Sequence, residues 1–171
     1  MNNKKDIEVL QEMAKRYAEI AAKPIQGERR RLWGDHFSLK RTRPPILATF
    51  GMWNYWAKEY FSDDVMKCED PYYRKYERNF RMAFFQDAIG DDSIIEPWIS
   101  MYAVVKSGWE ENWGIVEGHH GTSDDGGAVK FDAPIKDWSD VKKLKATHHE
   151  VDEIETKRRY SKLYDAIGKI L

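Results

Sequence analysis

The chain has 171 residues, of which 42% are hydrophobic and 33% charged, and its formal net charge at pH 7 is −1. This composition is typical of a folded domain, and the absence of a long apolar run excludes a membrane-spanning helix. A near-zero net charge gives no electrostatic basis for binding nucleic acid or an anionic membrane. The single cysteine, Cys68, excludes an internal disulfide framework, and the N-terminal residues lack the apolar segment of a signal peptide, so a cytoplasmic protein is expected.

Two helices are predicted at the N-terminus. Apolar residues recur at three- and four-residue spacing over 6–22, which indicates one apolar helix face that ends before Pro24. A second helix is predicted over 25–39. It contains the triplet Arg29-Arg30-Arg31, which we interpret as a solvated helix face rather than an anion site.

Two buried strands are predicted around a central helix. Residues 46–51 form a short apolar run after Arg43-Pro44-Pro45. Asp70-Pro71 is a typical helix start, and Gly90 is a typical stop. Residues 92–105 are the longest strand-like run of the chain. A crossover of this length between two strands predicts a right-handed parallel unit.

The C-terminal third has a different pattern. Residues 113–117 and 127–131 are short strand-like runs joined by the glycine-rich loop 118–126, which predicts a hairpin. A short helix is predicted over 140–144 and a long amphipathic helix over 149–169.

This order of elements and three local segments resemble the uroporphyrinogen decarboxylase family, whose superfamily includes corrinoid-dependent methyltransferases. The segments are 43–47, like the family's first strand, 87–96, like its second, and 125–144, like its hairpin with the cap Asp137-Trp138-Ser139-Asp140 and a short helix. The match is closest to a divergent bacterial branch and covers only the N-terminal part of the family's barrel, which needs about 250 residues.

The resemblance implies an α/β fold: the N-terminal part of a TIM (β/α)8 barrel with two parallel strands, N-terminal helices and an inserted β-hairpin. It implies one partial domain over 1–171. The expected parts are N-terminal helices (1–42), the first two barrel strands with their crossover helix (43–105), a hairpin insertion (106–138), and helices leading to a missing third strand (139–171).

Two departures from the family's pattern concern the substrate. Decarboxylases of the family carry an arginine-rich loop after the first strand, whereas residues 50–56 here are mostly aromatic and no arginine lies between Arg43 and Arg74. The family's aspartate after the second strand is replaced by Glu96. A substrate with many carboxylates would lack bidentate partners in this stretch, so the resemblance favours the methyl-transfer branch.

Glu96 is the candidate catalytic residue, because it would lie at the end of a strand and could bind substrate or a proton; a capping carboxylate is the alternative. His119 and His120 are weak metal candidates, because adjacent histidines in a strand point to opposite faces; a solvated hairpin tip is favoured. Acidic neighbours are expected to raise the pKa of Cys68, which argues against a nucleophile. Aromatic residues at the strand ends are candidates for substrate binding, although at least half are expected in the core: Trp53, Tyr55, Trp56, Trp98 and Tyr102.

The expected function is therefore that of the N-terminal portion of a protein that transfers a methyl group from a small methylated or aromatic substrate to a corrinoid carrier protein. There are two alternatives. One is a uroporphyrinogen-type decarboxylase, which is a lyase, and the other is a non-enzymatic module that binds a small ligand or a protein. No cofactor is expected within this chain, although relatives imply zinc or a corrinoid partner for a full-length protein. Self-association through open sheet edges is a further expectation.

Overall fold

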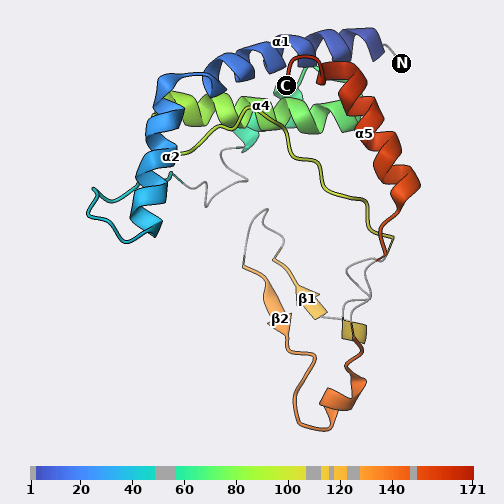
Figure 1. Ribbon diagram of the computed structural model, residues 1–171. Coiled ribbons are helices and arrows are strands. Elements are labelled where there is room, and N and C mark those ends of the chain that lie inside the picture. Colours follow the sequence, from blue (N-terminus) through green and yellow to red (C-terminus); the bar gives the residue numbers. More distant parts are fainter. Residues whose placement is uncertain (1–2, 49–56, 107–112, 116–117, 123–127, 147–149) are drawn as a thin grey trace. The chain divides into compact units, whose positions relative to one another are not determined.

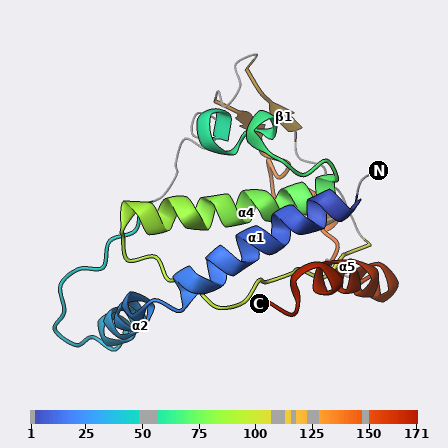
Figure 2. The ribbon, with the colours of Figure 1, turned by 90° about the horizontal axis from the view of Figure 1, so that it is seen from above.

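Two long helices, α1 (Asn3–Ala21) and α4 (Pro71–Ile89), lie side by side and form the main core (Figure 1, Figure 2). This computed structural model describes residues 3–48, 57–106, 113–115, 118–122, 128–146 and 150–171. The ring of Tyr17 on α1 meets the ring of Phe80 on α4 edge to face, with centroids 5.3 Å apart. Such an arrangement stabilises a core beyond the area it buries.

The chain divides into two compact units. The first unit comprises residues 1–100 and 162–171, and the second comprises residues 101–161. Helix α5 (Glu153–Ile167) ends in the first unit, where Leu163 and Ile167 are buried in the core and the side-chain amide of Gln11 donates to the carbonyl of Ala166 at 3.0 Å. Lys162 forms an ion pair with Asp70 at 2.5 Å, which joins α5 to the start of α4.

The predicted ends of α4 are confirmed. Asp70 caps the helix by accepting from the backbone N–H of Tyr72 at 2.8 Å, and Pro71 occupies the first helical position. At the other end Gly90 has φ 72°, a left-handed conformation that is strained for residues with a Cβ. Local chemistry alone was therefore sufficient to locate this helix.

Shorter elements surround this core. Helix α2 (Pro24–Phe37) follows α1 after a short turn, and two short helices, η1 (Ala57–Phe61) and η2 (Asp63–Val65), precede α4. In the second unit, β1 (Gly118–His120) pairs antiparallel with β2 (Lys130–Asp132), and the 3-10 helix η4 (Asp140–Lys143) follows. A hairpin is thus present, but its strands are shifted toward the C-terminus: β1 lies within the predicted loop 118–126, and β2 overlaps only the end of the predicted strand 127–131.

The expectation of a TIM-barrel portion with two parallel strands is wrong. The described residues contain one two-stranded antiparallel sheet, and helices are the main regular structure. Residues 46–48 and 92–104 form no strand, and Val105 makes only an isolated antiparallel bridge with Val151. The physical reason is that side chains, rather than a neighbouring strand, satisfy many of the backbone amides of these segments.

The long predicted helix face at the C-terminus is also only partly buried. Leu163 and Ile167 are in the core as the periodicity indicates, whereas Ile154 is 85% exposed and Tyr160 and Tyr164 are about half exposed. Periodicity identifies an apolar face, but the contacts available to it decide how much is covered. No helix in the described ranges is both long and apolar enough to cross a bilayer.

Glu77 is a buried carboxylate on which the first unit depends, and it provides a test of the fold. Its oxygens accept from the backbone N–H groups of Lys67 and Cys68 at 2.8–2.9 Å and from the guanidinium of Arg81 at 2.8 and 3.0 Å. We expect Glu77→Gln to lower the free energy of unfolding by about 3 kcal/mol, because Arg81 loses its counter-ion and the amide places a donor against donors.

Urea unfolding followed by far-UV circular dichroism measures this loss. Glu19→Gln, at an exposed position of α1, is the matched control and should leave stability within about 0.5 kcal/mol. A loss below about 1 kcal/mol for Glu77→Gln would show that the buried carboxylate is not required.

Candidate functional site

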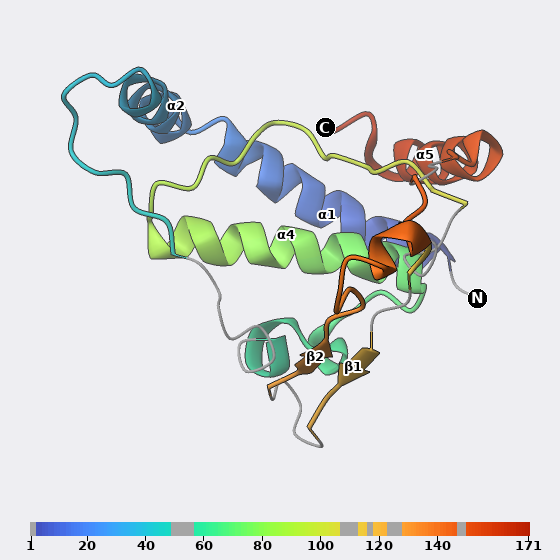
Figure 3. The same ribbon diagram turned by 90° about the horizontal axis from the view of Figure 1, so that it is seen from below.

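One face of α2 holds the extended segment that follows α4. Gln26, Arg29, Arg30 and Trp33 lie at helical positions i, i+3, i+4 and i+7, which share one side of a helix. All four hydrogen bond to residues of the stretch 92–96, which we call the clamped segment. Figure 3 shows this segment leaving the C-terminal end of α4 as extended chain.

The contacts of this helix face are mainly with backbone groups. The indole N–H of Trp33 donates to the carbonyl of Asp92 at 2.8 Å, and the guanidinium of Arg29 donates to the carbonyl of Ser93 at 3.0 Å. The side-chain oxygen of Gln26 accepts from the N–H of Ile95 at 2.9 Å. The clamped segment is thus held without strand pairing.

Glu96 is held by Arg30. The guanidinium of Arg30 donates to the Glu96 carboxylate from two nitrogens, with the shortest distance 2.6 Å, and the two side chains are 40% and 32% exposed. The hydrogen bond to Glu96 raises the pKa of Arg30 above its ordinary value. This fork-shaped pair holds the Glu96 carboxylate in a fixed position against α2.

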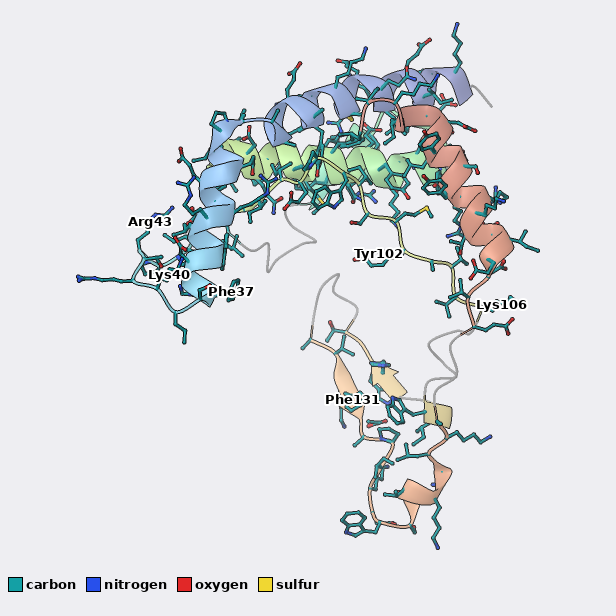
Figure 4. The ribbon with its side chains drawn as sticks, viewed as in Figure 1. Phe37, Lys40, Arg43, Tyr102, Lys106 and Phe131 are labelled. Atoms are coloured by element: carbon teal, nitrogen blue, oxygen red, sulfur yellow. The ribbon has the colours of Figure 1, made fainter. Side chains whose placement is uncertain are left out.

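Asp92 joins the clamped segment to the loop after α2, where Figure 4 shows Arg43. Two nitrogens of Arg43 donate to the two carboxylate oxygens of Asp92 at 2.6 and 2.7 Å. The N–H of Ile46 donates to the same carboxylate, and the N–H of Asp92 donates to the carbonyl of Ile46, both at 2.8 Å. The hydrogen bond from Arg43, with that from Ile46, lowers the pKa of Asp92 to about 2.

Asp91 makes a further connection between the same two stretches. One carboxylate oxygen accepts from the N–H of Ala48 at 2.7 Å, and the other accepts from the N–H of Ser93 at 2.9 Å. Both carboxylates are nearly buried, with 8% exposure for Asp91 and 7% for Asp92. This network therefore anchors the site and leaves neither carboxylate free for substrate.

The aromatic candidates are not assembled into a described pocket. Trp98, two residues after Glu96, is 56% exposed in the first unit. Tyr102 is 85% exposed and belongs to the second unit. Trp53, Tyr55 and Trp56 lie outside the described residues. Trp98 is thus the aromatic candidate whose position depends most directly on the hydrogen bonds between α2 and the clamped segment.

The two histidines occupy strand β1, not the hairpin tip. The Nε2 atom of His120 lies 2.7 Å from a carboxylate oxygen of Asp132 on β2, and the ring of His119 lies against the ring of Phe131 with centroids 5.7 Å apart. Within the described parts of the chain, no three His, Cys, Asp or Glu side chains are grouped to hold a metal ion. The described donor set does not fit zinc, and no chemical step is assigned to it.

Cys68 is buried and its pKa is raised to about 12, as expected for a non-nucleophilic thiol. The cause differs from the sequence-based prediction. Burial is the largest effect, and the relevant carboxylates are Glu77 and Asp6 instead of the neighbours Glu69 and Asp70.

The arginine triplet has a role that was not predicted from the sequence. Arg29 is only 6% exposed, and Arg30 pairs with Glu96, so the interpretation as a solvated face is wrong for Arg29 and incomplete for Arg30. The available signal was the spacing of Gln26, Arg29, Arg30 and Trp33. Comparisons with models of protein families, with curated proteins and with solved structures gave no match to this chain.

Substitution of Asp92 tests the network that positions Glu96. We expect Asp92→Asn to lower the free energy of unfolding at pH 7 by ~2 kcal/mol, because charge-assisted hydrogen bonds are replaced by weaker ones and Arg43 is partly solvated in either case. Since the pKa of Asp92 is held at about 2, below the ordinary 3.8, its stabilising effect is present above pH 3.8 and is lost as the pH falls toward 2.

The difference between wild type and Asp92→Asn should therefore shrink between pH 4 and pH 2. Urea midpoints measured across this range check the prediction, with Asp64→Asn, at an exposed position of η2, as the control. A constant difference across the range would contradict the assignment of the low pKa to Asp92.

Proposed function

We propose that this chain contributes a substrate-binding portion of a uroporphyrinogen decarboxylase-like protein that transfers a methyl group from a small methylated or aromatic compound to a corrinoid carrier protein. One observation carries the proposal. The segments 43–47 and 87–96, on which the resemblance depends, meet at Asp92 through its hydrogen bonds to Arg43 and Ile46. These contacts bring together residues that are more than forty positions apart in the sequence.

Trp98 suits a methylated cation. The face of an indole ring attracts quaternary ammonium groups. Trp98 is 56% exposed, so its ring is accessible to a ligand, while the clamp by α2 holds the residues before it. We assign Trp98 to binding of the methyl donor, and Glu96, held by Arg30, to positioning the segment that carries Trp98.

The transfer needs two reactants, the methyl donor and the reduced corrinoid. The bond between nitrogen and the methyl carbon breaks, the nitrogen keeps the bonding pair, and the reduced corrinoid, a substrate carried by a partner, supplies both electrons of the new bond to carbon. A methylated ammonium thus leaves as a neutral amine. The surface of this chain is required to bind and orient the methyl donor.

Decarboxylation of a porphyrinogen receives less support. A substrate with several carboxylates needs arginines that are free to pair with it, whereas Arg43 is occupied by Asp92 and Arg30 by Glu96. The single cysteine suits a reducing compartment, and we propose the cytoplasm as the location of the reaction.

A protein-binding module is the second candidate, favoured by exposed apolar side chains at the end of α2 and in the loop that follows. Phe37, Leu39 and Ile46 are 76%, 94% and 65% exposed, and Figure 4 shows Phe37 at the end of α2. Large apolar side chains that remain exposed are typical of interaction surfaces.

Substitution of Trp98 separates the two candidates. We expect the chain to bind phenyltrimethylammonium, and Trp98→Ala to weaken that binding by about tenfold, because the cation loses the indole face. Isothermal titration calorimetry measures the affinity, and anaerobic incubation with reduced cobalamin followed by detection of N,N-dimethylaniline tests methyl transfer. Trp138→Ala, at a position 90% exposed in the second unit, is the matched control and should bind normally. Equal affinities of wild type and Trp98→Ala would reject the proposed site.

A further inference from the structure

A surface groove lies between α1, α4 and the chain that precedes α4, and the Glu96 region contributes nothing to it. It has a volume of about 280 Å3. Its apolar wall includes Met13 and Phe84, and its charged residues are Glu12, Arg16, Lys67 and Arg81. All of these residues belong to the first unit.

The groove contains more positive than negative charge. Arg81 is paired with the buried Glu77, but neither Arg16 nor Lys67 forms a side-chain ion pair with a carboxylate of the described residues. The one carboxylate in the lining, Glu12, is not paired with them either. Two cations at the groove are therefore available to an anion.

Contacts on two sides of the groove hold its lining residues in place. Glu77 accepts from the backbone N–H of Lys67 at 2.9 Å and from the Arg81 guanidinium at 2.8 Å, which fixes one side of the lining. On the other side, the guanidinium carbon of Arg16 lies 4.2 Å from the centroid of the Phe84 ring. A cation stacked on a ring is restrained in position while its outer N–H groups stay available to bind.

We propose that this groove is a binding site for a small free carboxylate with an apolar body, such as an arene carboxylate or a short fatty acid. Arg16 and Lys67 bind the carboxylate, and Phe84 with Met13 packs against the apolar part. The volume of about 280 Å3 is just below the usual range for ligand pockets, about 300–1,000 Å3, so we expect a ligand of about the size of benzoate.

Titration calorimetry with sodium benzoate and sodium hexanoate tests the site in the full chain. Benzyl alcohol has the ring without the charge, and inorganic phosphate has charge without an apolar body, so both should bind at least tenfold more weakly than benzoate. We expect Arg16→Gln and Lys67→Gln each to weaken benzoate binding by about tenfold, the effect of losing one charge-assisted hydrogen bond. Thermal melting confirms that each variant is folded.

Lys15→Gln is the matched control, because Lys15 is exposed on α1 and does not line the groove. It should bind benzoate like the wild type. The site is rejected if benzoate binds no tighter than benzyl alcohol or phosphate, or if the double variant Arg16→Gln/Lys67→Gln retains full affinity. Trp98→Ala should leave benzoate binding unchanged, so failure of this proposal and failure of the methyl-donor site are separate results.

Discussion

The first unit depends on one constraint: the backbone N–H groups outside its helices need side-chain hydrogen-bond acceptors. An amide that is buried without a partner costs as much as a lost hydrogen bond, so each extended segment packed on the helices needs acceptors. Here four buried carboxylates and one amide oxygen supply them in place of a sheet. The backbone N–H groups of Glu69 and Asp70 donate to Asp6, those of Lys67 and Cys68 to Glu77, those of Ala48 and Ser93 to Asp91, that of Ile46 to Asp92, and that of Ile95 to Gln26.

The same carboxylates also organise the two proposed binding surfaces. Asp92 holds the start of the clamped segment and Arg43, so the stretch leading to Glu96 and Trp98 begins from a defined point. Glu77 fixes Arg81 and the backbone of Lys67 at the groove. Because these carboxylates already accept several hydrogen bonds, they suit the positioning of other residues better than a direct role in a reaction. The side chains that remain available to ligands are Trp98 at one surface and Arg16 and Lys67 at the other.

The contrast between the helices and the predicted strands follows from the range of the interactions. Asp70, Pro71 and Gly90 act on backbone groups within a few residues, so the ends of α4 could be predicted from sequence. The segments 46–48 and 92–96 have strand-like composition, but their state depends on which acceptors come near. Those acceptors are Asp91, Asp92 and Gln26, the last of them more than sixty positions away from its partner Ile95. Composition cannot reveal such a pairing.

By itself, the sequence determined the helical periodicity, the caps of α4, the presence of a hairpin, and the inert character of Cys68. Each of these depends on neighbours along the chain or on average burial, which composition and spacing record. Only the tertiary structure decided that Arg29 is buried, that Glu96 is paired with Arg30, and that the strand-like segments remain outside a parallel sheet in the described residues. The physical reason is that the partner of a charged side chain or an extended backbone is chosen by proximity after folding, and many partners are compatible with the same local sequence.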